Sequence, residues 1–255
     1  MIRCFAPDVE AEGGVVTLRD DEAQHVARVL RLRAGDVLRV FDGRGREFDA
    51  VIEQTTKSAV TVRVGAPRPV VPEPKVAVTL AQAVLKGEKM DDVVRDAVMM
   101  GVAAIQPLFT TRSEVTLSAL RRGDRRGRWQ RVAVASAKQC GRATVPAILE
   151  PQDFESWAPG GVQLGAPMPG KGSLPACLML VEPSAAERAV GLSNIDPTPP
   201  GAVTLLVGPE GGWTPREIEC GEACGRLVTL GARTLRADAV PIVALAALFA
   251  FWKEF

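Results

Sequence analysis

The stretch that most constrains the fold of this chain is VTLLVGPEGGWTPREIE, residues 203–219. Its first five residues are apolar and predict a strand buried on both faces, as in a parallel sheet. The glycines that follow allow a tight turn. Thr214, Pro215 and Glu217 then form the N-cap, first-turn proline and capping box of a helix start. This order of strand, turn and helix predicts a ligand site at the carboxyl edge of a parallel sheet.

Glu210, in the middle of the glycines, restricts which ligand the turn suits. A carboxylate would repel the phosphates that glycine loops commonly hold, and neither the P-loop pattern nor GxGxxG is present. The turn therefore favours a nucleoside-like ligand without phosphates, or one with a positive charge. A tight turn with only a structural role remains the alternative.

Composition excludes several classes of protein. The 255 residues carry a formal net charge of +1, so no overall field points to a nucleic-acid partner. The N-terminus lacks the apolar region of a signal peptide, and no apolar run reaches the roughly 18 residues of a membrane span. We therefore expect a cytoplasmic protein without membrane association.

Cysteine and histidine usage argues against a metal centre. The five cysteines are odd in number and mostly far apart, which favours reduced thiols over a disulfide framework or a zinc site. His25 is the only histidine, and for it a structural or surface position is favoured over catalysis. We expect no metal.

Residues 1–70 predict a small β-rich domain. Apolar residues that alternate or cluster predict strands at residues 15–18, 37–41, 47–52 and 59–64. A hairpin turn is expected at residues 42–45, and a short helix from about Asp21 to Leu30 with Asp20 as its cap. Short strands with turn signals favour a small barrel, and a proline-rich linker follows at residues 67–74.

Residues 75–255 predict a second domain of alternating strands and helices, hence a parallel sheet covered on both faces. Its strands are expected at residues 76–80, 103–108, 177–181, 203–207 and 227–230. A helix with Met90, Val93 and Ala97 on one face should end at Gly101. The last helix, residues 239–252, is apolar almost all round, which favours a subunit interface over burial under the sheet. Residues 158–175 predict a surface loop, with a substrate lid as the alternative.

Three further segments carry candidate functional residues. The loop at residues 230–239 holds Arg233 and Arg236, which would bind or orient an anion, and Asp238, for which a helix N-cap is favoured. The segment Lys86-Gly87-Glu88-Lys89-Met90 joins a strand end to a helix start. Residues 112–142 carry nine basic side chains against two acidic ones, either as a solvated helix face or as a phosphate-binding surface.

Together these segments resemble the RsmE family, the 16S ribosomal RNA uridine-N3 methyltransferases of the SPOUT (trefoil-knot) superfamily. The resemblance covers almost the whole chain. It rests on motifs that occur in the family's order: His25-x-x-Arg28-Val29-Leu30-Arg31 with Gly35-Asp36, Lys86-Gly87-Glu88-Lys89-Met90, Arg112-Ser113-Glu114, Arg128-Trp129, Gln139-Cys140-Gly141-Arg142, Val207-Gly208-Pro209-Glu210-Gly211-Gly212-Trp213 and Leu230-Gly231-x-Arg233-x-Leu235-Arg236.

The resemblance implies an N-terminal PUA-like β-barrel that holds RNA and a C-terminal α/β domain with a deep trefoil knot, dimeric through that domain. Its cofactor would be S-adenosylmethionine, a phosphate-free cation that suits Glu210, and its partner 16S ribosomal RNA or the 30S subunit. The cofactor would be held by the loops at residues 180–183, 207–212 and 230–235. The implied cofactor-binding residues are Leu180, Val207, Gly208, Glu210, Gly211, Gly212, Leu230, Gly231, Arg233 and Leu235. The implied RNA-binding residues are Arg3, His25, Arg28, Arg31, Lys86, Lys89, Arg112, Arg125, Arg126, Gln139 and Arg142.

The chain departs from the family pattern after Arg236. Where the family commonly has Leu-Arg-Thr-Glu-Thr-Ala, this chain has Leu-Arg-Ala-Asp-Ala-Val, residues 235–240. Arg236, with Arg142 as a possible second group, is expected to stabilise negative charge on the uracil, and Asp238 is a candidate general base. The departure leaves open a knotted RNA-binding ribosome-assembly factor without turnover. Glu210 and the absent P-loop lysine count against a third alternative, a phosphate-binding nucleotide hydrolase.

Overall fold

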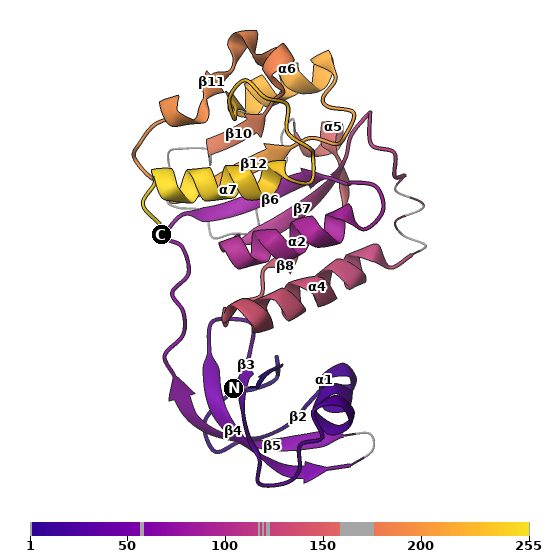
Figure 1. Cartoon of the computed structure of the whole chain (residues 1–255), viewed down its shortest axis with the longest axis vertical. Helices are drawn as coiled ribbons and strands as arrows, with labels where there is room; N and C mark the ends of the chain where they lie inside the picture. Colours follow the sequence, from indigo (N-terminus) through magenta and orange to yellow (C-terminus); the bar gives the residue numbers. More distant parts are fainter. Residues whose placement is uncertain are drawn as a thin grey trace. The chain divides into compact units, whose positions relative to one another are not determined.

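The computed structural model describes residues 2–56, 59–116, 118, 120, 123–158 and 176–254. The chain divides into two compact units (Figure 1). One consists of Met1–Glu73 with Val134–Val145, and the other of Pro74–Ala133 with Pro146–Phe255. The grouping of residues 134–145 with the N-terminal unit was not expected from the sequence. From residue 159 onward, the loop predicted at 158–175 lies outside the described residues.

The N-terminal unit is built on a mixed five-stranded sheet with the order β1-β3-β4-β5-β2. Its strands are β1 (Arg3–Phe5), β2 (Val15–Thr17), β3 (Val37–Phe41), β4 (Glu47–Thr55) and β5 (Val60–Arg68). β1 runs parallel to β3, and the other pairs are antiparallel. Two register shifts between β4 and β5 bend the sheet, which curls around a core that includes Leu38, Val40 and Val62.

The expected barrel is therefore a PUA-like half-barrel, with β1 and β2 at opposite edges of the sheet. The four predicted strands are confirmed. β1 was not predicted because Arg3-Cys4-Phe5 contains no β-branched residue, whereas the equally short β2 is Val15-Val16-Thr17. The predicted helix is confirmed as α1 (Asp20–Gln24) followed by a π-helical turn, η1 (His25–Val29). The proposed cap was wrong: Arg19 is the N-cap residue and makes no side-chain capping bond, whereas Asp20 is the first helical residue.

The C-terminal unit contains an eight-stranded sheet with the order β11-β13-β10-β12-β6-β7-β8, in which β9 also pairs with β7. All of these pairs are parallel. The five predicted strands are confirmed as β6 (Ala77–Ala83), β7 (Ala104–Phe109), β10 (Ala176–Leu180), β12 (Ala202–Val207) and β13 (Arg226–Thr229). Three two-residue strands were not predicted: β8 (Ala147–Ile148), β9 (Gln152–Asp153) and β11 (Val190–Gly191).

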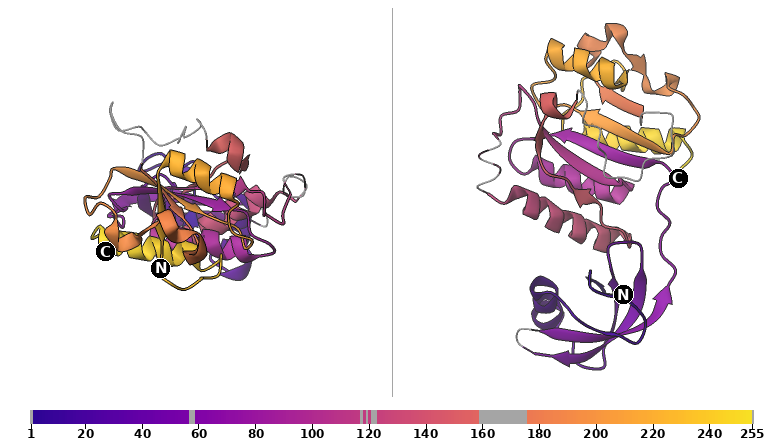
Figure 2. Two further views of the ribbon diagram at one scale, coloured as in Figure 1. Left: turned by 90° about the horizontal axis from the view of Figure 1, so that it is seen from above. Right: turned by 180° about the vertical axis from the view of Figure 1, so that it is seen from behind.

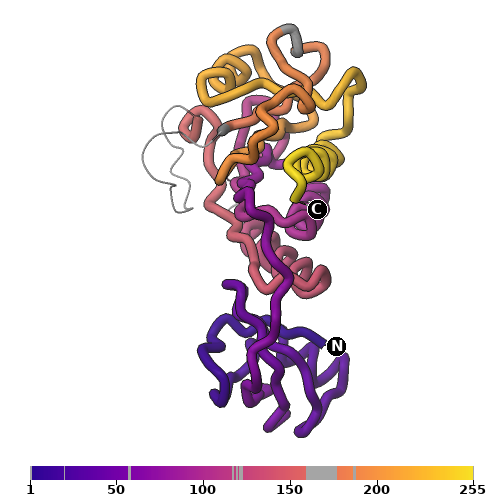
Figure 3. The backbone as a smooth tube through the Cα atoms, turned by 90° about the vertical axis from the view of Figure 1, so that its left-hand side faces the viewer, coloured from indigo at the N-terminus to yellow at the C-terminus, as the bar shows by residue number. Residues whose placement is uncertain are grey.

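Helices cover both faces of this sheet, as the view from above in Figure 2 shows. α2 (Lys89–Met100) and α7 (Val240–Phe251) lie side by side on one face (Figure 3), and α5 (Phe154–Trp157) and α6 (Pro215–Cys224) lie on the other. Further helices with described bounds are α4 (Arg125–Cys140) and the short 3-10 helices η2 (Pro183–Arg188) and η3 (Leu192–Asn194). α2 buries the predicted apolar face and ends at Gly101, whose φ is 102°.

α7 buries only one of its faces within this chain. Pro241, Ala244, Leu245, Leu248 and Phe249 are buried, while the opposite face is partly exposed and includes Val243 at 41%. No helix among the described residues is long and apolar enough to span a membrane. The trefoil knot stays a prediction, since residues 159–175, between α5 and β10, are not described.

Candidate functional site

The site lies where three neighbouring strands end. β13, β10 and β12 are adjacent and parallel, so the loops that leave their carboxyl ends meet at one edge of the sheet. These loops, residues 180–183, 207–213 and 229–240, line a cavity of about 350 Å³ together with Lys89 at the start of α2. Such a volume suits a small organic ligand.

Trp213 joins the glycine turn to the neighbouring loop. Its indole Nε1 donates a hydrogen bond of 2.8 Å to the carbonyl oxygen of Leu180, and its ring packs 5.2 Å from that of Phe154. A Cβ at Gly208 would lie 3.0 Å from the indole. A side chain at residue 208 would therefore require the Trp213 ring to shift.

Arg112 supports the same turn from outside. Its Nη1 donates to the carbonyl oxygens of Gly211, at 2.9 Å, and Trp213, at 3.1 Å. A Cβ at Gly211 would lie 2.9 Å from the Arg112 Cβ. Arg112, which the family resemblance implied as an RNA contact, thus positions the turn. Gly211 faces Arg112 and does not line the cavity.

The helix that follows the turn begins as predicted. Thr214 and Glu217 form a complete capping box, with Pro215 in the first turn of α6. The Glu217 carboxylate is buried and also accepts a 2.8 Å hydrogen bond from the Thr111 amide. Glu217 therefore connects α6 to the segment after β7, a link that the local sequence pattern could not reveal.

Six charged side chains line the cavity: Lys89, Glu182, Glu210, Arg233, Arg236 and Asp238. Lys89 Nζ lies 2.8 Å from Glu210 Oε1. Burial alone would raise the pKa of Glu210, but hydrogen bonds from the Lys89 ammonium and from backbone amides bring that pKa below its usual value. Glu210 is thus ionised and already has a cationic partner, which the sequence did not predict.

Asp238 binds Arg236 and does not cap α7. Arg236 donates to both carboxylate oxygens, from Nε at 3.0 Å and from Nη2 at 2.9 Å, and these bonds lower the pKa of Asp238. The N-cap residue of α7 is Ala239, which makes no side-chain capping bond. The predicted cap at Asp238 was wrong because this carboxylate is committed to the bidentate ion pair.

The predicted cofactor residues line the cavity apart from Gly211 and Gly231. Lys89, which the resemblance implied as an RNA contact, lines it as well. Glu182, Pro183 and Thr234 also line the cavity; they lie in the loops that the resemblance implied for the cofactor but were not named individually. Trp213 lies just beyond the implied glycine loop, residues 207–212, and was not predicted as a site residue.

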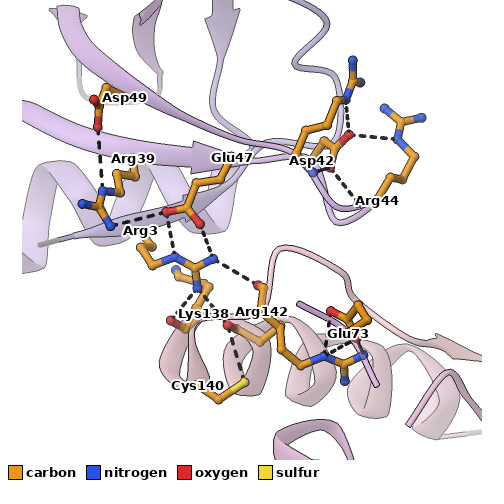
Figure 4. A network of polar contacts seen from close by, with 12 residues as sticks. Arg3, Arg39, Asp42, Arg44, Glu47, Asp49, Glu73, Lys138, Cys140 and Arg142 are labelled. Carbon is orange, nitrogen blue, oxygen red and sulfur yellow. Dashed lines mark hydrogen bonds and ion pairs between the residues drawn. The ribbon is translucent and has the colours of Figure 1, made fainter. Parts of the chain in front are cut away.

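Two arginines that the resemblance implied as RNA contacts have structural roles in the N-terminal unit (Figure 4). Arg3 forms an ion pair with Glu47 and donates to the carbonyl oxygens of Ala137, Lys138 and Arg142 at the end of α4. Arg142 binds the Glu73 carboxylate. Their side chains are only 10% and 6% exposed. Arg3 satisfies carbonyls that a helix end leaves without partners.

The other basic residues of this region that the structure describes are also largely paired. Arg126 binds Glu150 and the Ile148 carbonyl oxygen, Arg128 binds Glu88 and Asp91, and Lys138 binds Glu22. Lys86 pairs with Glu114 at 2.7 Å. The run therefore offers fewer charges to phosphate than its sequence suggests.

The remaining RNA-binding candidates lie on accessible segments. His25, Arg28 and Arg31 are exposed in and just after η1, and Arg31 adopts a positive φ of 56°. Arg125 and Gln139 lie on α4. Within the described ranges, the side chains of these five residues make no hydrogen bond or ion pair.

The cysteines of the described part are free thiols. Burial raises the pKa of Cys4 and of Cys177 to about 12, which keeps both thiols protonated. No group of three or more histidine, cysteine, aspartate or glutamate residues in that part of the chain is arranged to hold a metal ion.

Two family models match the chain: an RNA methyltransferase domain over residues 72–249 and an RNA methyltransferase PUA domain over residues 18–65. The ribosomal RNA small subunit methyltransferase E of Synechocystis is 32% identical and aligns with 94% of this chain and 74% of its own length. The protein of the same name from Mycobacterium bovis is 31% identical, with 92% and 86% covered.

Two solved structures share the fold, each with a TM-score of 0.84 and 31% identity. One is a ribosomal RNA small subunit methyltransferase E from Neisseria gonorrhoeae bound to S-adenosylmethionine, which matches over 99% of this chain and 98% of that chain. The other is a methyltransferase from Legionella pneumophila in complex with the same cofactor, with 98% and 97% covered.

Proposed function

Because this chain belongs to the RsmE family of small-subunit ribosomal RNA methyltransferases, we propose that it uses S-adenosylmethionine to methylate N3 of a uridine in 16S ribosomal RNA. The observation that carries the proposal is the cavity enclosed by the loops after β10, β12 and β13. The solved relatives with the same fold bind S-adenosylmethionine.

The residues of the cavity fit this cofactor. Leu180, Val207, Leu230 and Leu235 provide apolar surface for an adenine ring, and the loops offer backbone groups for ribose hydroxyls. The lining carries three carboxylates and three cations, and two of each form ion pairs, so it lacks the excess of cations that holds a polyphosphate. When bound, S-adenosylmethionine supplies an electrophilic methyl group on a sulfonium.

We assign to Arg236 the stabilisation of negative charge on the uracil. Its side chain is 75% exposed at the cavity, and its charge is permanent, so it suits the negative charge that develops when N3 loses its proton. Asp238 holds the guanidinium of Arg236 through two hydrogen bonds. A carboxylate with a lowered pKa is a weak base, so we assign Asp238 to positioning Arg236 and not to removing the proton. Arg142 is bound to Glu73, so we do not assign it to stabilising charge on the uracil.

RNA binding is assigned to polar side chains that have no partner among the described residues. His25, Arg28 and Arg31 in the N-terminal unit, with Arg125 and Gln139 on α4, would contact the RNA backbone. Such contacts predict an affinity that falls steeply with salt. The target uridine would have to leave its stack to reach the cavity. Because this substrate is ribosomal, we place the enzyme in the cytoplasm.

We also propose a homodimer through α7. The outer face of this helix carries Val243, 41% exposed, and the neighbouring α2 carries Met99, 40% exposed. An apolar helix face left partly open to solvent is typical of a subunit interface.

Calorimetric titration with S-adenosylmethionine tests the cofactor half of the proposal. We expect saturable binding of one molecule per chain. A Gly208→Trp variant, which would place a large side chain against Trp213 and into the cavity, should bind much more weakly. Absence of binding by the wild-type chain would refute the assignment as an enzyme.

A further inference from the structure

Two ion pairs account for four of the six charges that line the cavity. Lys89 binds Glu210, and Arg236 binds Asp238. Within the part of the chain that the structure describes, the side chains of Glu182 and Arg233 make no hydrogen bond or ion pair. The cavity therefore presents one carboxylate and one guanidinium whose charges are not matched within the site.

These two residues come from neighbouring strands. Glu182 lies in the loop after β10, and Arg233 in the loop after β13, which pairs directly with β10 through Leu180 and Val228. Glu182 lies against the glycine turn, because a Cβ at Gly212 would be 2.9 Å from its Oε1. Both side chains are exposed, so their charges are available to a ligand.

We propose that Glu182 and Arg233 bind the amino-acid end of the cofactor, with Glu182 accepting hydrogen bonds from its α-ammonium and Arg233 donating to its α-carboxylate. This assignment rests on the proposed function, which supplies the cofactor. An α-amino acid carries one group of each sign, which matches the two unpaired charges of the cavity. The planar fork of arginine suits a carboxylate in particular.

The assignment changes the role expected for Glu210. The sequence made Glu210 the carboxylate that faces the positive cofactor. In the structure its charge is offset by Lys89, and Lys89 occupies the first residue of α2, where a cation is unfavourable next to the helix dipole. The ion pair therefore gives each of these charges a partner of opposite sign, and Glu210 adds little net charge to the cavity.

Calorimetry with three ligands tests the inference: S-adenosylmethionine, its neutral product S-adenosylhomocysteine, and 5′-methylthioadenosine, which lacks the amino-acid end. The variants are Glu182→Gln and Arg233→Met, with Glu210→Gln as the matched control from the same lining. We expect each of the first two variants to bind both ligands that carry the amino acid with an affinity about tenfold lower, which corresponds to about 1.4 kcal/mol. Binding of 5′-methylthioadenosine should be unchanged, which also shows that the cavity is intact.

Each other pattern overturns the inference in its own way. An equal loss of affinity for all three ligands in Glu182→Gln would indicate a general distortion of the cavity. A loss of affinity for S-adenosylmethionine alone in Glu182→Gln would place Glu182 next to the sulfonium. Selective loss of the amino-acid ligands in Glu210→Gln, with none in Glu182→Gln, would assign the ammonium to Glu210. If the wild-type chain bound none of the three, the proposed function itself would fail.

Discussion

Trp213 holds two walls of the cavity together, because its indole lies between the glycine turn and the Leu180 carbonyl oxygen. Trp213→Phe keeps most of the ring packing and removes this hydrogen bond. We expect a loss of about 1 kcal/mol in the free energy of unfolding and weaker binding of S-adenosylmethionine, measured by urea denaturation and calorimetry. Trp157→Phe is the control, since Trp157 packs in the same core cluster without lining the cavity. Unchanged cofactor affinity in Trp213→Phe would contradict this role.

Asp238 gives a second test at a single residue, because a positioning group and a general base predict different pH profiles. The Arg236 hydrogen bonds lower the pKa of Asp238, so the carboxylate is charged throughout the neutral range. Asp238→Asn should slow methyl transfer by a similar factor at every pH, while the rate still rises towards alkaline pH as N3 of uridine ionises. Single-turnover rates between about pH 6 and 9 measure this. A wild-type rate that is flat over this range and becomes pH-dependent only in Asp238→Asn would restore Asp238 as the base, because a carboxylate that stays ionised would accept the proton equally well at each pH.

Residue types alone predicted the charged groups of the site better than their partners. The loops that hold Glu210, Arg233 and Arg236 could be found from strand ends and motifs. The ion pairs between these groups could not be predicted. Lys89 and Glu210 are far apart in the sequence and come together only because β6 and β12 lie side by side. For the same reason the burial of Arg3 and Arg142 was not foreseen.

Among the helices and strands, the start of α6 depends on Thr214, which makes only local contacts, and on Glu217, which also binds the distant Thr111 amide. Thr214→Ala removes only the local cap and should cost about 1 kcal/mol. Glu217→Ala also leaves the amides of Thr111 and Thr214 without their acceptor, so it should cost more, since an unsatisfied buried group costs roughly 1–3 kcal/mol. Amide hydrogen exchange in the first turn of α6 and around Thr111 measures both effects. Equal exchange rates in the two variants would show that the Thr111 link contributes nothing.

Elements with several turns or alternations were predictable, whereas most short ones, apart from the β-branched β2, were not. The five apolar strands, the faces of α2 and the capping box all have local patterns that tertiary contacts reinforce. β1, β8, β9 and β11 have two or three residues each and exist through pairing with neighbours. The two predicted caps were misplaced in different ways, since Asp20 is the first residue of α1, whereas Asp238 precedes the N-cap residue of α7 and binds Arg236.

At the level of the whole molecule, the proposed dimer depends on the exposed face of α7. Val243→Asp would place a charge in that apolar surface, and burying it in an interface without a partner is costly. We expect the variant to run as a monomer in size-exclusion chromatography with light scattering, while Val71→Asp, at another exposed valine, leaves the assembly intact. A wild-type chain that is monomeric at high concentration would contradict the proposed homodimer.

The central claim is that the cavity at the ends of β10, β12 and β13 carries out methyl transfer to small-subunit ribosomal RNA. Its most direct test is incubation of the protein with 30S subunits and methyl-labelled S-adenosylmethionine, followed by digestion of the RNA and identification of the labelled nucleoside by mass spectrometry. We predict label in 16S ribosomal RNA as N3-methyluridine. No label under conditions in which the cofactor binds would contradict the claim and favour an assembly factor without turnover, and label confined to transfer RNA would contradict the substrate.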